Sequence, residues 1–211
     1  MGKCEPRDKP SERSPQRERR YAAILQAAED LFLEQGYENT TLAEIVRMSR
    51  GSLATLYEMF GNKQGLLHAI ARRWSGATLA KSFDGKGPPS QSKIDLLREY
   101  ARHQAEVMRS PHTVALMRMM ISEGFRDRSF ARQTYDDLHR PAIRELSSLF
   151  AQWTAAGDSD FDRPEAAAEL FLSLVAGNFA LNALAGVEDD SLEDDMVQWR
   201  LEAFFALFRL S

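Results

Sequence analysis

Apolar residues along most of the chain recur every three or four positions, as they do on the buried face of an α-helix. The first such stretch places six apolar residues on one face: Tyr21, Ile24, Leu25, Ala28, Leu31 and Phe32. Gly36 predicts its end, because glycine readily adopts the left-handed conformation that closes a helix. No stretch shows convincing strand alternation, so the pattern predicts an all-α protein of about nine helices.

Two very short helices are predicted next, joined by a tight turn. Thr41 and Glu44 have the spacing of a capping box, in which each side chain satisfies a backbone N–H of the other residue. Arg50 and Gly51 form the turn, and Ser52 can cap the next helix. Helices this short are not stable alone, so both must pack on the first helix.

Leu56 and Phe60 are the residues expected to attach the third helix to the first two. Three helices within about 45 residues, the last two joined by a turn containing glycine, constitute a helix-turn-helix. A short third helix suits a groove, since the major groove of DNA is about 12 Å wide. The pattern therefore indicates that the outer face of this helix reads DNA.

A fourth helix comes next, capped by Asn62, and the proline- and glycine-rich stretch 84–93 indicates a linker. Further helices are predicted over about 92–109, from Pro111 onward, and over about 127–156, 164–185 and 191–210. Pro141 lies inside one of them and predicts a kink or a break, because its ring clashes with the carbonyl of Asp137.

Charge and composition narrow the function. The net charge is -4, yet residues 1–75 carry +2 and residues 76–211 carry -6, which suggests an anionic partner at one end or merely chance. Cys4 is the single cysteine, so an intramolecular disulfide and zinc sites built on cysteine pairs are excluded, and the four histidines lack metal-ligand spacing.

No catalytic constellation, membrane-length apolar run or secretory signal is found. We expect a cytoplasmic protein without cofactor or metal that is not an enzyme.

Residues 17–77 resemble the DNA-binding domain of the tetracycline-repressor-like (TetR) family of transcriptional regulators. The resemblance depends on "ILQAAEDLFLEQGYENTTLAEI" and "TLYEMFGNKQGLL". Three departures from the family pattern affect the turn and the readout. Ser49, Arg50 and Gly51 stand where alanine, glycine and valine are frequent, Leu53 replaces a polar residue, and the pair at 58 and 59 is unusual.

The resemblance implies which residues contact DNA. Thr41 opens the helix that contacts phosphate, and Tyr57 and Lys63 match a phosphate-contacting tyrosine and lysine. The full predicted set is Thr41, Arg50, Ser52, Leu53, Ala54, Thr55, Tyr57, Glu58 and Lys63. Two roles stay open: Leu53 either meets a thymine methyl or packs locally, and Glu58 either accepts from cytosine or is simply solvated.

The resemblance also implies a ligand cavity and a dimer. The cavity is expected in the methionine- and aromatic-rich middle helices, where an ordinary core is the alternative; candidate residues are His103, Met117, Met120, Tyr135, His139 and Trp153. The last two helices carry apolar stripes, which are expected to pair with a second chain through Leu170, Leu174, Leu181, Val197, Leu201, Phe204, Phe205 and Phe208.

Together these expectations describe a homodimeric repressor that leaves a palindromic, double-stranded operator when a mostly apolar small molecule binds. The organisation predicted is a disordered arm at 1–16, a helix-turn-helix domain at 17–77 with its motif at about 41–60, and a ligand-binding and dimerisation domain at 78–211. Two alternatives remain: a DNA-binding activator without ligand gating, and a helical small-molecule binding protein.

Overall fold

The structure, a computed structural model, describes residues 15–82, 92–157, 159, 161–187 and 190–210. The predicted arm at 1–16 lies outside these residues except for Pro15 and Gln16, which begin the first helix. Proline is favoured at this position because it has no N–H, and an N–H in the first turn would have no acceptor within the helix. Most of the predicted linker at 84–93 also lies outside. Contacts divide the chain into two compact units, 1–66 and 67–211, termed here the head and the body. The domain boundary predicted after residue 77 lies further along the same helix.

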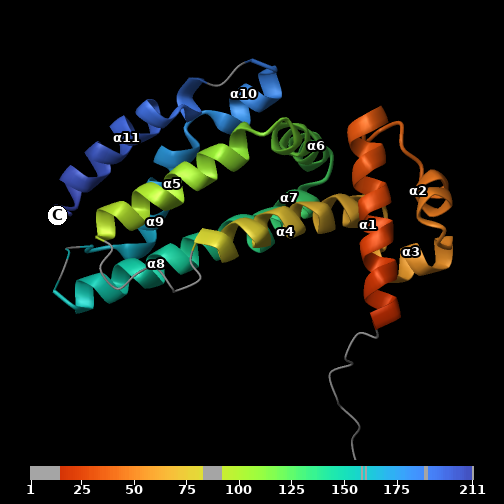
Figure 1. Ribbon diagram of the computed structural model, residues 1–211, viewed down its shortest axis with the longest axis horizontal. Helices are drawn as coiled ribbons and strands as arrows, with labels where there is room; N and C mark the ends of the chain where they lie inside the picture. The colour runs from red at the N-terminus through yellow and green to blue at the C-terminus, as the bar shows by residue number, and fades with distance from the viewer. Residues whose placement is uncertain (1–14, 83–91, 158, 160, 188–189, 211) are drawn as a thin grey trace, which may run out of the picture. The chain divides into compact units, whose positions relative to one another are not determined.

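The head consists of α1 (Pro15–Gln35), α2 (Leu42–Ser49), α3 (Leu53–Phe60) and the first turn of α4 (Lys63–Ser82) (Figure 1). As predicted, Gly36 comes directly after the end of α1, with a φ of 88°. Leu56 is fully buried, and the ring of Phe60 stacks on Tyr21 of α1 with 4.7 Å between centroids. This burial stabilises two helices that are too short to form by themselves.

The described residues of the body form helices joined by turns and loops, with no strand among them. Its elements are α5 (Lys93–Arg109), α6 (Pro111–Arg126), α7 (Arg128–Thr134), the π-helix η1 (Tyr135–His139), α8 (Arg140–Ala155), α9 (Pro164–Ala176), α10 (Phe179–Ala185), the short 3-10 helix η2 (Asp190–Leu192) and α11 (Asp194–Leu207). Among the described residues, the predicted nine helices are obtained when α7, η1 and α8 count as one run, α9 and α10 as another, and the three-residue η2 is not counted. The all-α prediction is confirmed.

The π-helix is where the structure accommodates Pro141. The backbone N–H of Arg140 donates to the carbonyl of Tyr135, five residues earlier, so the turn before the proline is wider than an α-turn. A π turn relieves the conflict between a proline ring and the carbonyl four residues before it, because the local register is shifted by one residue. The helical run therefore continues through Pro141, and the predicted break does not occur.

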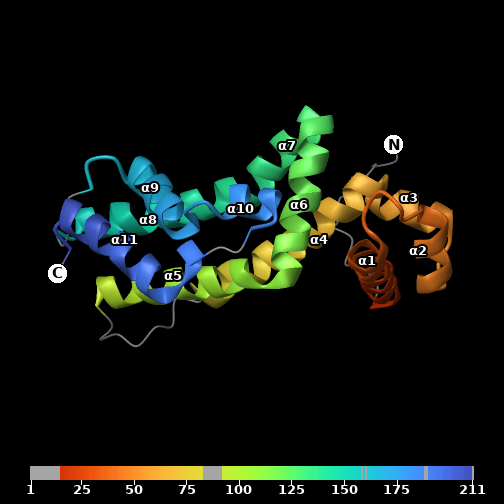
Figure 2. The same ribbon diagram turned by 90° about the horizontal axis from the view of Figure 1, so that it is seen from above.

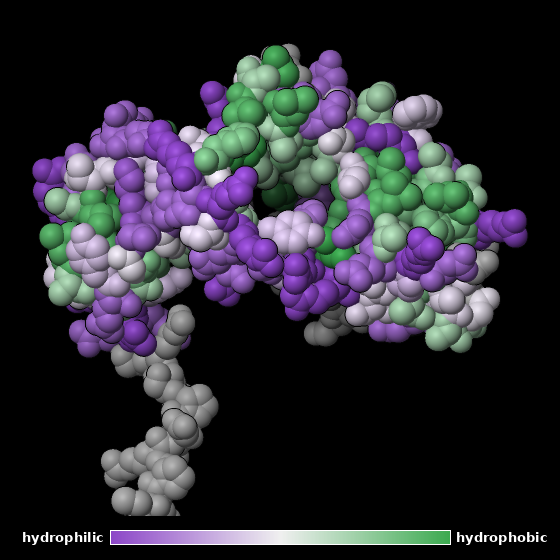
Figure 3. All heavy atoms as spheres, turned by 180° about the vertical axis from the view of Figure 1, so that it is seen from behind, coloured by the Kyte–Doolittle hydropathy of each residue, from purple (hydrophilic) through white to green (hydrophobic). Residues whose placement is uncertain are grey.

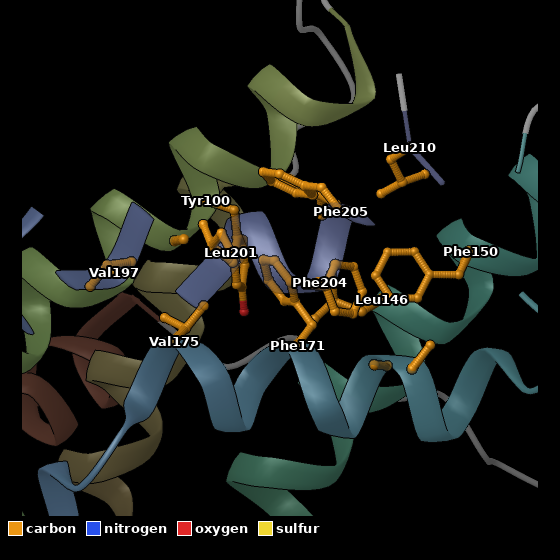
Figure 4. Close-up of a cluster of buried hydrophobic side chains, with 14 of the residues drawn as sticks. Tyr100, Leu146, Phe150, Phe171, Val175, Val197, Leu201, Phe204, Phe205 and Leu210 are labelled. Carbon is orange, nitrogen blue, oxygen red and sulfur yellow. The ribbon is translucent and has the colours of Figure 1, made fainter. Parts of the chain in front are cut away.

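The core of the body is an aromatic cluster between α5, α8, α9 and α11 (Figure 4). Phe204 lies at its centre, with ring centroids 5.3 Å from Phe171 and 5.9 Å from Phe150. Because α11 packs along α5 and α9, one face of α11 is covered by its own chain (Figures 1 and 2).

That packing corrects one prediction. Four residues of the predicted dimer interface are buried inside their own chain and cannot contact a partner: Val197, Leu201, Phe204 and Phe205. Phe208 is partly buried against the same cluster, with its ring 4.7 Å from that of Phe204. An apolar stripe shows that a helix face is buried, but it does not show which chain buries it.

One helical run among the described residues, Pro164–Ala185, is long and apolar enough to cross a membrane by length and composition alone. Its inward residues Phe171, Val175 and Phe179 are buried in the body, and Gly177 interrupts it with a φ of 53°. Packing inside the chain therefore accounts for the inward face of this run, whereas Leu170, Leu181 and Leu184 on its other face are exposed.

We predict that Phe204→Ala lowers the free energy of unfolding by about 3–5 kcal/mol, because it leaves a large cavity in a close-packed cluster. Gln198→Ala on the same helix should change it by less than about 0.5 kcal/mol. Urea unfolding followed by circular dichroism measures both. Similar small losses for the two variants would contradict the packing of α11 against α5 and α9.

Candidate nucleic-acid interface and ligand cavity

The N-terminus of α2 carries the predicted capping box. The backbone N–H of Glu44 donates to Oγ1 of Thr41 at 3.2 Å, and the backbone N–H of Thr41 donates to Oε2 of Glu44 at 2.8 Å. The backbone N–H and the hydroxyl of Thr41 both donate to the Glu44 carboxylate, and these two bonds lower the pKa of Glu44. The amides of Leu42 and Ala43, in the first turn, have no partner four residues earlier within the helix and can face an anion.

Arg50 and Gly51 form the turn between α2 and α3, as predicted. Arg50 is the residue that takes the left-handed conformation, with φ 52° and ψ 36°. Gly51 instead serves close packing, since a Cβ there would lie 3.3 Å from Oγ of Ser49 and 3.7 Å from Cδ1 of Ile24. Its N–H donates to the carbonyl of Val46 at 3.0 Å and closes the helix end. The exposed Arg50 side chain is thus projected from a well-defined turn.

The outer face of α3 is uncovered. Ser52 caps the helix, as predicted, by accepting from the N–H of Thr55 at 3.1 Å. Leu53 is 43% exposed and Tyr57, one turn later, is 53% exposed. Ala54 and Glu58 are exposed beside them, while Leu56 points into the head. Four of the predicted DNA contacts therefore share one solvent-facing surface, as residues spaced by three or four positions on a helix do.

Two charged residues of the head have partners that the sequence did not reveal. A guanidinium nitrogen of Arg17 on α1 lies 3.3 Å from Oε1 of Glu58 on α3. Nζ of Lys63 donates to the carbonyls of Tyr37 at 2.6 Å, Thr40 at 3.0 Å and Glu38 at 3.3 Å. Both contacts join residues more than twenty positions apart, so no local pattern indicates them.

The body contains a cavity of about 720 Å³ that is open on one side. It lies among α4, α5, α6, η1 and the α9–α10 region, and a hollow with a hydrophobic interior is visible on one face of the molecule (Figure 3). No Asp, Glu, Lys or Arg is among the described residues that line it. Its polar wall residues are Gln104, Thr113, Thr134, Tyr100, Tyr135 and His139. Such a space suits a mostly apolar molecule with a few hydrogen-bonding groups.

Four predicted ligand residues line the cavity: Met117, Met120, Tyr135 and His139. Trp153 and His103 do not. Trp153 is fourteen residues after His139, about 21 Å along a helix, and packs on Phe150 in the aromatic cluster. His103 precedes a lining residue, and adjacent helical residues point in different directions.

Several lining residues were not predicted. Tyr100, Gln104, Val107 and Met108 share one face of α5, and Phe125 ends α6 with its side chain 80% exposed. The spacing of the α5 residues by four, three and one positions was visible in the sequence as a helix face. Nothing in that spacing distinguished a cavity wall from a filled core.

Burial shifts the pKa values of three ionisable groups in the body toward the uncharged form. It raises the pKa of Tyr100, with the Glu145 carboxylate acting in the same direction. Burial also lowers the pKa of His112, whose ring lies 4.3 Å from that of Trp74, and of His68, where the Asp137 carboxylate at 3.4 Å acts in the opposite direction. Within the described ranges no group of three His, Cys, Asp or Glu residues could hold a metal ion.

Comparison with known proteins gives matches of two kinds. The helix-turn-helix repressor ComR of Escherichia coli K12 is 41% identical over 59 residues, which cover 28% of this chain and 28% of ComR. The chain thus matches less than a third of this relative's length. A candidate TetR-family regulator from Mesorhizobium loti aligns over 92% of this chain and 99% of its own with a TM-score of 0.74 at 22% identity. The flavonoid-responsive regulator FrrA aligns over 90% and 97% with a TM-score of 0.67 at 27% identity.

Two family models together span most of the chain. Residues 24–70 match the model of the TetR family of bacterial regulatory proteins. Residues 95–209, more than half of the chain, match the C-terminal domain of AefR-like transcriptional repressors. Both models describe transcriptional regulators rather than enzymes. The chain therefore belongs to the TetR family of bacterial transcriptional regulators.

Proposed function

We propose that this regulator is a sequence-specific DNA-binding repressor that acts as a homodimer and leaves its operator when a small, uncharged and mostly apolar molecule enters the body. The observation that carries the DNA-binding part is the uncovered face of α3, capped at Ser52 and flanked by the N-terminus of α2. ComR and the AefR-like proteins are both named as repressors, which supports repression rather than activation.

On DNA, α3 would lie in the major groove with the residues of its outer face against base edges. Leu53 and Ala54 offer apolar contacts for thymine methyl groups, and Thr55 offers a hydroxyl. Tyr57 lies one turn beyond Leu53 and is placed to donate to a phosphate. Arg50 and the first-turn amides of α2 would hold the backbone and set the register.

The dimer interface proposed here differs from the predicted one. The apolar side chains that remain uncovered on α9, α10 and α11 are Leu170, Leu181, Leu184, Met196, Trp199 and Leu207. Trp199 is 71% exposed and Leu181 is 64% exposed, which is unusual for large apolar residues unless a partner covers them. Pairing of these helices with their copies would give a twofold dimer, which demands an approximately palindromic operator.

The cavity supports an uncharged ligand. A charged group buried there would find no opposite charge among the described lining residues, and burying an unpaired charge costs several kcal/mol. Gln104 and Thr113 can orient a neutral polar group, and Met117 and Met120 adapt to the shape of an apolar body. FrrA, with which the chain shares its fold, is named for a response to flavonoids, themselves aromatic molecules.

Gating would pass through α4, which runs from the head into the body. Ala71 and Trp74 of α4 line the cavity, while its first residue, Lys63, belongs to the head. A ligand bound against Trp74 would favour one of two positions of α4. It would change the affinity for DNA by as much as the ligand's own affinities for these two conformations differ. A protein with this task acts on chromosomal DNA, so we place it in the cytoplasm, with no membrane partner.

Sequencing the genomic fragments that the protein retains would test the DNA-binding proposal and define the operator. On that operator, Leu53→Ala and Thr55→Val should each alter discrimination at one or two base pairs by about 1–3 kcal/mol, because each removes a contact to a base edge. Binding to a panel of single-base operator variants measures this. Unchanged preference for both proteins would place the readout outside α3.

The charge of the ligand can be tested with a matched pair of fluorescent probes. N-phenyl-1-naphthylamine should bind at least about tenfold more tightly than 1-anilinonaphthalene-8-sulfonate, which has the same rings and an added sulfonate. Met120→Trp should weaken binding of the neutral probe by filling the cavity, whereas Met48→Trp on exposed α2 should not. Equal affinities for the two probes would refute the uncharged ligand.

For the dimer, Trp199→Asp should shift the protein from dimer to monomer at micromolar concentration, because it places a carboxylate in an apolar interface. Sedimentation velocity measures the shift. Met48→Asp, an equally simple change of an exposed apolar residue on α2, should leave the dimer intact. Dissociation by the second variant and not the first would move the interface to the head.

A further inference from the structure

The ammonium group of Lys63 is surrounded by three backbone carbonyls. Nζ lies 2.6 Å from the carbonyl oxygen of Tyr37, 3.0 Å from that of Thr40 and 3.3 Å from that of Glu38. It also lies 4.4 Å from the centroid of the Tyr37 ring, close enough for a cation–π interaction. An ammonium has three donor hydrogens, and three carbonyls surround this one.

The three carbonyls converge on Lys63 because residues 37–40, named here the carbonyl turn, are held in one conformation. The Tyr37 side chain is buried and packs edge-on against Phe32 at 5.0 Å. The N–H of Thr40 donates to the carbonyl of Tyr37 at 3.3 Å, and the buried Thr40 hydroxyl donates to the carbonyl of Gly36 at 2.9 Å. A turn of this kind leaves several carbonyls pointing the same way, and Lys63 satisfies them.

The carbonyl turn leads directly into α2. The next residue, Thr41, is the N-cap of that helix, so the turn sets where the first-turn amides of α2 lie. Lys63 itself is the first residue of α4. Asn62 caps this helix, because its side-chain oxygen accepts from the N–H of Gly65 at 2.8 Å. Lys63 therefore joins the start of α4 to the start of α2 across the head.

We propose that Lys63 is a positioning residue for DNA binding and not a phosphate ligand. Its ammonium fixes the N-terminus of α2 relative to the first turn of α4, so that a displacement of α4 is transmitted to the phosphate-binding amides of α2. The inference rests on the proposed DNA binding and changes the role that the family resemblance implied for this residue.

A direct phosphate contact by Lys63 would have a different cost. The ammonium would have to leave the carbonyl turn, and three charge-assisted bonds, two of them to part-buried acceptors, would be lost for one bond to an exposed phosphate. The two roles also predict different salt dependence. Removing a phosphate contact reduces the slope of log K against log salt by about 0.9, whereas removing a positioning contact leaves it unchanged.

The test compares the wild-type protein with Lys63→Met and Lys63→Arg on the selected operator between about 50 and 200 mM salt. Both variants should lose affinity by about tenfold, equal to about 1.4 kcal/mol, with the wild-type slope retained. Arginine preserves the charge, but its planar fork does not fit three convergent carbonyls. Full affinity of Lys63→Arg, or a slope lowered by about one in Lys63→Met, would overturn the proposal.

Amide hydrogen exchange on the free proteins tests the same contact without DNA. Lys63→Met should lose protection at the start of α2 and in the carbonyl turn, while the amides of α1 around Ile24 keep theirs. Unchanged protection in the turn would overturn the positioning role. If the wild-type protein selects no DNA at all, the proposed function fails, and the exchange result still decides whether Lys63 holds the turn.

Discussion

Helices of eight residues are not stable in water by themselves, and this constraint governs the head. Both α2 and α3 have this length, and each is present because Ile45, Leu56 and Phe60 are buried against α1. N-caps at Thr41 and Ser52 satisfy the first amides, and Lys63 satisfies the carbonyls of the loop between α1 and α2. With its inner face and its ends stabilised from within, α3 can leave its outer face uncovered.

The body has a different constraint, since it must be stable although it contains a cavity. Its stability is concentrated in the aromatic cluster around Phe150, Phe171 and Phe204, at the end of the bundle where α8, α9 and α11 meet. The cavity is lined mainly by α5, α6 and η1, where methionines such as Met117 and Met120 stand beside the rings of Tyr100, Phe125 and Tyr135. The π turn before Pro141 lies in this wall, and Tyr135 and His139 at its ends both line the cavity. A close-packed cluster beside a cavity allows a bound molecule to change packing locally without loss of the fold.

The last helices use their apolar residues on two faces. Leu201, Phe204 and Phe205 of α11 complete the core of their own chain, whereas Met196, Trp199 and Leu207 face outward. The outward set, together with Leu181 and Leu184 of α10, is the surface assigned here to the dimer. Apolar residues on both faces explain why the run Pro164–Ala185 is so hydrophobic in a protein whose total charge content is ordinary.

Local chemistry was sufficient to predict much of this protein from its sequence. The capping box at Thr41, the cap at Ser52, the stop at Gly36 and the inward positions Leu56 and Phe60 depend on neighbours within a few residues, so their pattern determined them. Contacts between distant segments were decided only by the tertiary structure. Arg17 meets Glu58 and Lys63 meets Tyr37 across the head, Trp153 lies too far along its helix to reach the cavity, and Phe204 faces its own chain. Helical periodicity specifies which face of a helix is buried, but the partner of that face depends on how the helices cross, and no local spacing encodes the crossing.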